Sequence, residues 1–246
     1  DEAGGLVGEA NDMTIIESKS SGTVEADDSF VGGLVGRNSE TIIRRSYSTA
    51  DVSGDDRVGG LVGANGGYIY DSYARGNVTA ASDQAGGLAG RCGREITRSY
   101  ATGEVSAPSE AGGLMGSDDG CDVVDSFWDT DTSLQSSSAG SETGKTTTEM
   151  KNLTTFTDTA TLGLSTTWDF DTVWNIKDDK NDGYPCLQWT DGCPEVPETD
   201  DTDGIAASTE DDAPNGGDAN NDGTDDSIQN HVSSFVNPVT NKYTVV

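Results

Sequence analysis

A short motif that recurs at a nearly constant spacing limits what this chain can fold into more than any other feature. The tripeptide Gly-Gly-Leu begins at Gly4, Gly32, Gly59, Gly86 and Gly112, so one copy follows another every 26–28 residues. A fixed period of this length is typical of solenoids, propellers and other repeat architectures. Residues 1–127 are therefore interpreted as five copies of one structural unit.

Four further columns keep register with the glycines. A serine recurs at Ser18, Ser46, Ser72, Ser99 and Ser126. An aromatic residue follows four of these serines, at Tyr47, Tyr73, Tyr100 and Phe127, whereas the first copy has Lys19. Two aliphatic columns flank each serine, one formed by Ile15, Ile43, Ile69, Ile96 and Val123 and the other by Val24, Val52, Val78 and Val105. Disordered low-complexity sequence does not keep such columns in register, so an ordered β-protein is favoured.

Each copy is predicted to contain about three short strands, because β-branched and aromatic runs alternate with Gly, Asn, Asp and Ser. One copy cannot bury its own apolar side chains, but stacked copies can, so the predicted fold is an all-β solenoid of about five rungs. At about 4.8 Å per strand the stack is about 24 Å long. The leucines of the motif are expected to form an inward ladder, and the Ile, aromatic and Val columns to form others: Leu6, Leu34, Leu61, Leu88 and Leu114. A propeller or sandwich is the alternative, but a propeller blade needs about 40 residues.

The residue before each serine carries a charge whose sign alternates along the repeat: Glu17, Arg45, Asp71, Arg98 and Asp125. These side chains cannot all point inward, so a corner of the rung is expected here. In a stack each charge would lie over its opposite, which predicts an outward ladder of salt bridges. Such a ladder would determine how neighbouring rungs align more than it would stabilise the fold, because an exposed ion pair contributes only about 0–1 kcal/mol. Chance alternation is the competing interpretation.

The composition argues against several functional classes. The chain has 246 residues with 44 acidic and 14 basic side chains, which gives a formal net charge of −30. Nucleic acid and anionic membrane surfaces are poor partners, since a phosphate backbone requires Lys and Arg to replace its counterions. The sequence contains no apolar run long enough to cross a membrane. Only 32% of the residues are hydrophobic and 32 residues are glycine, which disfavours a helical bundle.

The repeat pattern reads GGLVG-x-N followed by Ile-x-x-Ser-Tyr-Ala-x-Gly-x-Val, and it is clearest in residues 59–78. It resembles the GLUG repeat of secreted and surface-attached prokaryotic proteins. The later stretches FWDTDTS, TTEM, WDFDTVW and DGYPCL are similar to the segment that trails such repeats. The resemblance implies an extracellular or cell-surface location, in adhesins, fibres or non-catalytic regions of secreted peptidases. Lys19 and Ala50 depart from the pattern where it has an aromatic residue and a glycine.

Residues 128–193 leave the period and contain all four tryptophans, Trp128, Trp168, Trp174 and Trp189. Aromatic side chains bury large areas, so this segment is predicted to cap the open end of the stack, where unpaired strand edges promote association. Residues 146–151 are expected to begin a short helix, with a Thr as N-cap and Glu149 in its first turn. Carbohydrate binding by the tryptophans is the alternative.

Four cysteines are expected to form two disulfides, because an even number in a secreted acidic protein favours pairing. Cys186 and Cys193 enclose a short loop, and Cys92 and Cys121 lie in equivalent stretches of neighbouring rungs. Zinc is disfavoured, since the chain has no Cys-x-x-Cys pair and a single histidine, His231.

An acidic linker over residues 194–230 contains a predicted calcium loop. Oxygen ligands fall at loop positions 1, 3, 5, 7 and 9, with Gly223 at position 6, in the spacing of an EF-hand-type loop: Asp218, Asn220, Asp222, Thr224 through its carbonyl, and Asp226. Gln229 stands where a bidentate Glu is usual. A weaker upstream loop contains Asp201, Asp203 and Glu210. The stretch resembles thrombospondin type 3-like calcium repeats, so Ca²⁺ is the expected cofactor.

Residues 231–246 are expected to be the start of a further β segment or an exchanged strand. The stretch from Ser227 to Val246 is similar to the entry into an anchor-type β domain. Together with residues 1–127, 128–193 and 194–230, residues 231–246 make four predicted regions. The chain starts inside a repeat and ends in a strand-like run, which suggests a segment of a longer polypeptide or a subunit completed by its neighbours.

Three functional hypotheses follow. The first is a non-enzymatic extracellular structural protein, a rod-like unit of a surface adhesin or a self-assembling filament, whose partners are further copies or neighbouring domains. The second is a glycan-binding module. The third is a polysaccharide-processing β-helix enzyme with a basic face formed by Arg44, Arg45, Arg75, Arg91, Arg94 and Arg98. The repeats are nearly equivalent and no rung carries a distinctive catalytic constellation, which favours the structural role.

Overall fold

The computed structural model describes residues 2–27, 29–140, 142–177, 180–190 and 193, together with the backbone of two later strands. The chain forms two compact units, Asp1–Cys193 and Pro194–Val246. In the second unit β26 (Ser234–Asn237) and β27 (Lys242–Val245) pair as an antiparallel hairpin.

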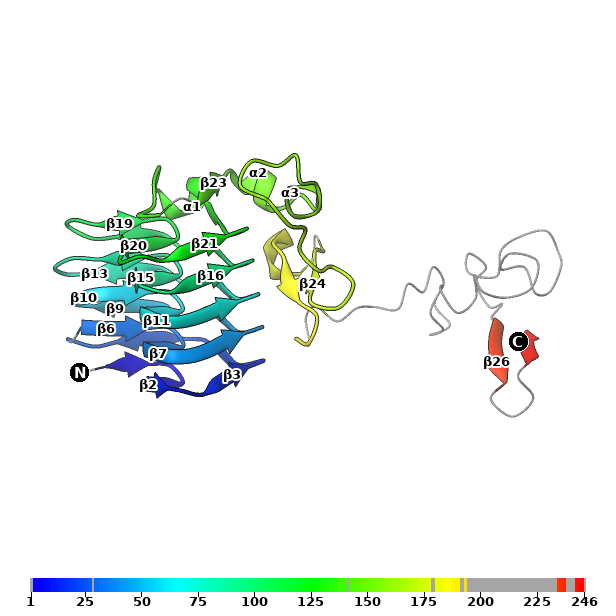
Figure 1. The fold of residues 1–246 in the computed structure, drawn as a ribbon, viewed down its shortest axis with the longest axis horizontal. Coiled ribbons are helices and arrows are strands. Elements are labelled where there is room, and N and C mark those ends of the chain that lie inside the picture. Colours follow the sequence, from blue (N-terminus) through cyan, green and yellow to red (C-terminus); the bar gives the residue numbers. More distant parts are fainter. Residues whose placement is uncertain are drawn as a thin grey trace. The chain divides into compact units, whose positions relative to one another are not determined.

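The first unit is a stack of rungs in which each repeat contributes one layer, so the predicted β-solenoid is confirmed (Figure 1). Four parallel sheets run along the stack. The first sheet contains β1 (Ala3–Gly4), β6 (Ser29–Gly32), β10 (Asp56–Gly59), β14 (Ala85–Gly86) and β19 (Ala111–Gly112). The long sheet contains β2 (Val7–Asn11), β7 (Val35–Arg44), β11 (Val62–Tyr70), β15 (Ala89–Cys92) and β20 (Met115–Asp118), joined by β3 (Thr14–Ile16), β16 (Glu95–Thr97) and β21 (Asp122–Val124).

The other two sheets complete each rung. The aromatic sheet contains β4 (Lys19–Ser20), β8 (Tyr47–Ser48), β12 (Tyr73–Ala74), β17 (Tyr100–Ala101), β22 (Phe127–Asp129) and β23 (Thr143–Lys145). The valine sheet contains β5 (Thr23–Glu25), β9 (Asp51–Gly54), β13 (Val78–Ala80) and β18 (Val105–Ser106). A rung therefore has four strands rather than the three predicted, because the Gly-Gly-Leu motif is itself a corner between the first sheet and the long sheet.

The pairing register follows the sequence columns. Gly59 pairs with Gly32 on one side and Gly86 on the other, and Ile69 pairs with Ile43 and Ile96. The Gly-Gly-Leu corner needs glycine because the backbones of consecutive rungs meet there. A Cβ on Gly59 would overlap the carbonyl oxygen of Val62 and lie 2.6 Å from the amide nitrogen of Gly90. The spacing of 26–28 residues between copies of the motif is thus the length of one full turn.

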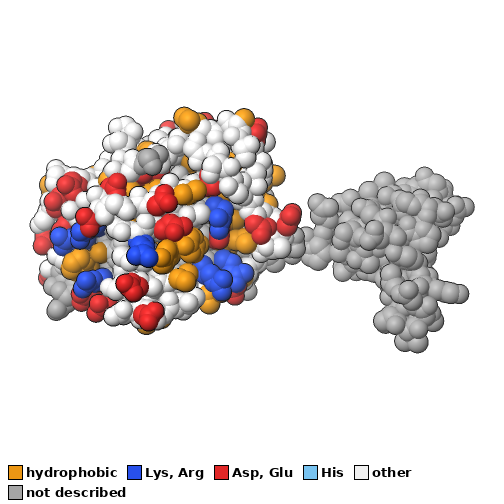
Figure 2. Space-filling model, in the orientation of Figure 1, with side chains coloured by type: hydrophobic (Ala, Val, Ile, Leu, Met, Phe, Trp, Pro, Cys, Tyr) orange, Lys and Arg blue, Asp and Glu red, His pale blue; other side chains and the backbone are white. Residues whose placement is uncertain are grey.

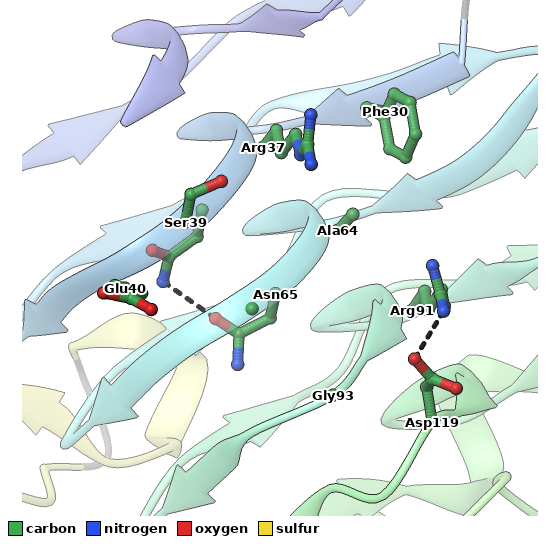
Figure 3. A pocket seen from close by; sticks show the side chains of 11 residues that line it. Phe30, Arg37, Ser39, Glu40, Ala64, Asn65, Arg91, Gly93 and Asp119 are labelled. Atoms are coloured by element: carbon green, nitrogen blue, oxygen red, sulfur yellow. Dashed lines mark hydrogen bonds and ion pairs between the residues drawn. The ribbon is translucent and has the colours of Figure 1, made fainter. Parts of the chain in front are cut away.

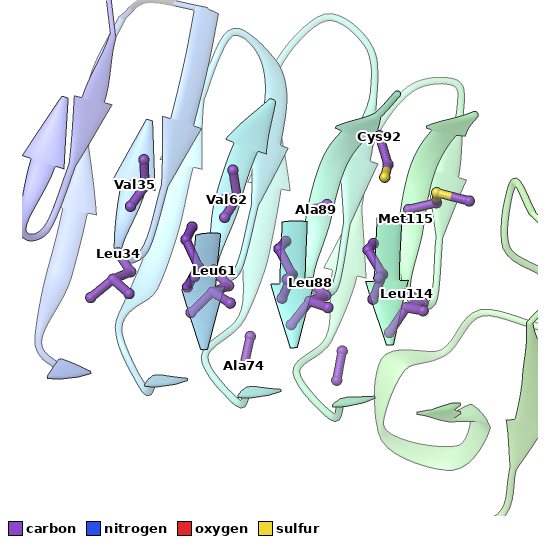
Figure 4. Packing of buried hydrophobic residues seen from close by; sticks show 14 of the residues in the cluster. Leu34, Val35, Leu61, Val62, Ala74, Leu88, Ala89, Cys92, Leu114 and Met115 are labelled. Carbon is purple, nitrogen blue, oxygen red and sulfur yellow. The ribbon is translucent and has the colours of Figure 1, made fainter. Parts of the chain in front are cut away.

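The interior is filled by the predicted aliphatic columns (Figure 4). Four of the five motif leucines are completely buried: Leu34, Leu61, Leu88 and Leu114. Leu6, in contrast, is 51% exposed, because rung 1 has a neighbour on only one side in the described part of the chain. Complete burial of one leucine contributes about 1.5–3 kcal/mol, so the ladder is a principal source of stability. The Val column is buried in a second cluster with Val31 and Val58.

Buried polar columns hold the rungs in register. The backbone N–H of each serine donates to the hydroxyl of the next one along the stack, from Ser18 to Ser126, over 3.1–3.2 Å. Each hydroxyl donates in turn to the carbonyl two residues before it, as Ser72 does to Tyr70. Asn38 and Asn65 form a second buried pair, in which one side-chain amide donates to the other over 2.8 Å. The serine column is therefore a structural ladder, since buried polar groups require partners.

The C-terminal end of the stack is closed by the chain itself. Trp128 points into the interior and packs with the leucine ladder, and its indole N–H donates to the carbonyl of Gln135. The Ser138 hydroxyl accepts hydrogen bonds from the backbone N–H groups of Leu114 and Met115. Finally, β23 pairs with β22 and adds a sixth strand to the aromatic sheet. This part of the predicted cap covers the end, as expected.

The rest of residues 128–193 lies along the side of the stack and not over its end. The side plate, defined as the described part of residues 146–193, turns back along the stack and covers the outer face of the aromatic sheet (Figure 1). It contains α2 (Thr147–Met150), α3 (Thr154–Thr157), β24 (Trp174–Asn175), a 3-10 turn (Asn181–Gly183) and β25 (Cys186–Leu187), and α1 (Thr130–Ser133) precedes it. Helix α2 begins at the N-cap Thr146 with a capping box to Glu149, which confirms that predicted helix start.

The aromatic column was expected to point inward, and this is wrong. Tyr73, Tyr100 and Phe127 point outward and are buried by the side plate. The next residue of each strand points inward instead, as Ala74 and Ala101 do. Strands alternate their faces, so the residue after each aromatic one points inward. This inward residue is small between stacked rungs, as at Ala74 and Ala101, and is Trp128 at the closed end.

Candidate functional site

The predicted calcium ligands lie outside the described residues. These are Asp218, Asn220, Asp222, Thr224 and Asp226, with the weaker set Asp201, Asp203 and Glu210. Within the described residues, no group of three or more His, Cys, Asp or Glu side chains is placed to hold a metal ion. In the same part of the chain, no helix is long and apolar enough to cross a membrane.

Both expected disulfides are present. Cys92 of β15 bonds to Cys121 in the next rung, and Cys186 of β25 bonds to Cys193. The first bond links rung 4 to rung 5 and lies next to the buried pair Asn38 and Asn65. The Asn65 side-chain amide donates a hydrogen bond to the Cys92 sulfur over 3.4 Å. The second closes the end of the side plate.

We expect removal of the first disulfide to cost more than removal of the second. A disulfide restricts the unfolded chain in proportion to the logarithm of the loop it closes, and the two loops span 29 and 7 residues. The double variant Cys92→Ser/Cys121→Ser should lose about 3–4 kcal/mol of unfolding free energy, roughly 1 kcal/mol more than Cys186→Ser/Cys193→Ser. Urea denaturation of the two variants measures the difference, and a reversed order would contradict this ranking.

The alternating charge column forms a corner, as predicted, but not a continuous ladder. All five residues have left-handed backbone angles, with φ from 45° to 50°. Glu17 pairs with Arg45 over 3.0 Å, and Asp71 pairs with Arg98 over 2.6 Å. The hydrogen bond that Arg98 donates to the Asp71 carboxylate raises the pKa of Arg98. Among the described residues the column therefore makes two separate ion pairs across adjacent rungs.

Asp125 departs from the predicted ladder because the side plate takes it over. Its carboxylate is buried and accepts hydrogen bonds from the Ser165 hydroxyl over 2.9 Å and from the Thr166 backbone N–H over 3.1 Å. Its carbonyl accepts from the Trp168 indole N–H. Asp125 thus anchors the plate to rung 5 instead of extending a row of surface charges.

The tryptophans are structural in this arrangement. Trp168 and Trp174 are buried with their ring centroids 4.7 Å apart, and Trp174 packs against Tyr73 and Tyr100. Trp189 is half-buried and donates its indole N–H to the carbonyl of Arg45. None of these rings forms an exposed platform on which a sugar could stack, so the tryptophan-based glycan hypothesis loses its support.

Three tyrosines beneath or within the plate have raised pKa values. Burial raises the pKa of Tyr73 and of Tyr100, and burial together with a hydrogen bond to Asp129 raises the pKa of Tyr184 to about 12. The Tyr100 hydroxyl donates to the Pro185 carbonyl over 2.6 Å. The folded chain therefore keeps these protons at a pH where the unfolded chain releases them.

We expect alkaline pH to unfold this unit through these tyrosines. Their contribution is fully present below the ordinary tyrosine pKa of about 10 and is lost above it, at about 1.4 kcal/mol per pH unit for each tyrosine. Denaturation followed between neutral pH and pH values above about 10 should show this loss, together with the tyrosinate absorbance of the unfolded chain. Tyr100→Phe should reduce the dependence of unfolding free energy on pH by about 1.4 kcal/mol per pH unit. An unchanged pH dependence would contradict the role given to Tyr100.

The six arginines that suggested a basic face are distributed over different surfaces. Arg75 lies at the plate and donates to Asn181 and Asp182 over 2.5 and 2.6 Å. Arg94 donates to the Tyr68 hydroxyl, and Arg91 pairs with Asp119. Figure 2 shows Lys and Arg side chains beside hydrophobic ones on the face that carries β7, β11 and β15.

The sequence reasoning did not identify two residues of this face, Phe30 and Arg37. The Arg37 guanidinium lies 5.7 Å from the Phe30 ring centroid, and that of Arg57 lies 4.9 Å from it. Neither residue belongs to a repeated column, so a search for columns passes over them. The usable signal was composition: all eight arginines of the chain fall between residues 37 and 98.

Comparison with known proteins gives one family match. Residues 54–79 match the family described as the GLUG motif. This stretch is one turn of the solenoid, from the end of β9 through β10, β11 and β12 into β13. No curated protein matches the chain. No solved structure matches it either. The match is consistent with the β-solenoid repeat fold that the structure shows.

Proposed function

We propose that this chain is a non-enzymatic structural protein, a rod-like stem segment of an extracellular adhesin. The observation that carries the proposal is the use of every repeated column for building the stack. The leucine, isoleucine and valine columns fill the interior, and the serine column bonds one rung to the next. Repeats that are equivalent in this way determine length and stiffness and leave no rung chemically distinct.

The two disulfides support an extracellular location, because disulfides persist in oxidising compartments. The GLUG match is compatible with the same location. Self-assembly into filaments is the competing version of the structural role. Head-to-tail growth needs an open receiving end, and here the Trp128 side chain and the Ser138 hydroxyl occupy the C-terminal end of the stack. We therefore favour the stem over the filament.

We further propose that calcium orders the acidic region after the stem. The motif that supports this is the spacing of Asp218, Asn220, Asp222 and Asp226 around Gly223. A hard cation with six to eight oxygen ligands would remove much of the repulsion within a segment that contains many carboxylates. The ion would stiffen the connection between the stem and the residues that follow the loop.

Negative-stain electron microscopy of the purified chain, with calcium and then with a chelator, tests these proposals together. Separate short rods in both conditions are expected for a stem. Long regular filaments would overturn the stem in favour of self-assembly. Calcium binding is measured separately by calorimetry on the chain and on Asp218→Asn/Asp222→Asn, and the double variant should lose the high-affinity heat. If the original chain gives no calcium heat, the calcium proposal fails and the stem proposal is untouched.

A further inference from the structure

A groove crosses rungs 2 to 5 on the outer face of the long sheet. It encloses about 320 Å³ where β7, β11 and β15 bend, next to the register shift after Gly66 (Figure 3). Its floor is made by small residues, Ala64, Gly66 and Gly93, and its rim carries Arg37, Arg91 and Phe30. The groove runs along the stack, so a bound molecule would lie across several rungs.

The floor is kept low by a glycine that the backbone does not require. A Cβ on Gly93 would lie 3.6 Å from its nearest neighbour, which is ordinary contact, and Gly93 has no left-handed φ. Gly67, one strand away, is different, because a Cβ there would lie 2.6 Å from the Asn38 side-chain oxygen. Gly93 lies in the bend between β15 and β16, outside both strands. A glycine that neither backbone angle nor packing requires leaves room for a ligand to approach the backbone closely.

Two arginines flank this floor at matched positions. Arg37, Ala64 and Arg91 are register partners on three successive strands. Their backbones are about 4.8 Å apart from strand to strand, so the two arginines start about 9.6 Å apart with the small Ala64 between them. The Phe30 ring lies under Arg37 and restricts where its guanidinium can go.

Both guanidinium groups can accept an anion at small cost. Arg37 lies 3.9 Å from Glu2 and 3.8 Å from Glu9, at the limit of an ion pair, and its side chain is 48% exposed. Arg91 pairs with Asp119, whose side chain is 61% exposed. Exposed pairs contribute about 0–1 kcal/mol, so a carboxylate that binds an arginine through two hydrogen bonds can replace them.

We propose that this groove binds an acidic polysaccharide whose carboxylates are spaced to meet Arg37 and Arg91. The backbone groups on the floor already pair within the long sheet, so an extended peptide would find no free strand edge there. A polymer with dense charge is disfavoured by the net charge of −30 on the chain. A glycan with a carboxylate on every second sugar carries fewer charges than such a polymer. Its carboxylates lie about as far apart as two rungs, about 9.6 Å. Glu40 and Asp119 remain at the rim as acceptors for sugar hydroxyls.

Titration calorimetry of the full chain with a hyaluronan hexasaccharide, in which uronate alternates with a neutral sugar, tests the proposal. Saturable binding is expected. Arg91→Gln should weaken it roughly tenfold, since it removes a charge-assisted pair. Gly93→Val should weaken it similarly by filling the floor. Arg44→Gln is the matched control: it removes the same charge from an exposed position of the same sheet outside the groove, and should change the affinity less than twofold.

Four outcomes would overturn the proposal. Absence of saturable hexasaccharide binding is one. Equal weakening by Arg44→Gln and Arg91→Gln would indicate diffuse electrostatic attraction, and equal binding of a neutral chitin hexasaccharide would remove the role of the arginines. Equal binding of an oligoglutamate peptide would assign the groove to acidic peptides. Circular dichroism of each variant establishes that the solenoid is intact, and the stem role does not depend on any of these results.

Discussion

Replacing Gly59 by alanine should destabilise the solenoid by about 4 kcal/mol or more, a larger effect than ordinary core substitutions have. The added Cβ would meet backbone on two sides, the carbonyl oxygen of Val62 in its own rung and the amide nitrogen of Gly90 in the next. Backbone atoms of paired strands cannot move aside as a side chain can, so rungs 3 and 4 would have to separate. Urea denaturation followed by far-ultraviolet circular dichroism measures the loss.

The matched control is Gly93→Ala. It is the same chemical change, made in the bend between β15 and β16, but its Cβ would lie 3.6 Å from the nearest atom. We expect its stability to stay within about 0.5 kcal/mol of the original or to rise slightly, because alanine restricts the unfolded chain more than glycine does. Equal stability losses at the two positions would mean that the Gly-Gly-Leu corner is not where consecutive rungs meet most closely.

Replacing Trp174 by alanine should cost about 3–5 kcal/mol and release the side plate from the aromatic sheet. Its ring is fully buried and contacts Trp168, Tyr73 and Tyr100, so its removal leaves a large cavity at the centre of the interface. The comparison variant is Leu162→Ala in the same plate, where the leucine is 76% exposed and the expected loss is within about 0.5 kcal/mol.

Two spectroscopic signals separate the plate from the solenoid. All four tryptophans lie between residues 128 and 189, so tryptophan fluorescence reports on the plate and the closed end. Far-ultraviolet circular dichroism reports chiefly on the strands. In Trp174→Ala the fluorescence transition should precede the dichroism transition, whereas in the original chain the two should coincide. Coincident transitions in the variant, at unchanged stability, would contradict a role for Trp174 in holding the plate.

The sequence predicted the stack well because the rungs are nearly identical. Wherever one column repeats, in-register pairing of the copies buries the same residue in every layer, and the observed partners Ile43, Ile69 and Ile96 follow from that alone. The capping box at Thr146 and Glu149 was also predictable, since it depends on residues three positions apart. Both are cases in which the determining contacts are local or periodic.

The predictions that proved wrong concern directions and distant contacts. Register alone does not say which face of a strand points inward, so the tyrosine column was assigned to the interior. The segment that covers this column lies far along the chain: Tyr100 and Pro185, which share a hydrogen bond, are 85 residues apart. A related clue was present in the first copy, where Lys19 is exposed in place of an aromatic residue. The Asp125 carboxylate was misassigned for the same reason, because its partners Ser165 and Thr166 belong to the plate.

The side plate contacts each of rungs 2 to 5 through a different residue. Trp189 bonds to rung 2, the 3-10 turn to Arg75 of rung 3, Pro185 to Tyr100 of rung 4, and Ser165 to Asp125 of rung 5. In an ordinary solenoid each layer interacts only with its neighbours, so a pulled chain can lose rungs one after another from an end. Here one element bridges four layers, and the loss of any of them weakens its hold on the others. Under tension these layers should resist and then give way together, as a single mechanical block.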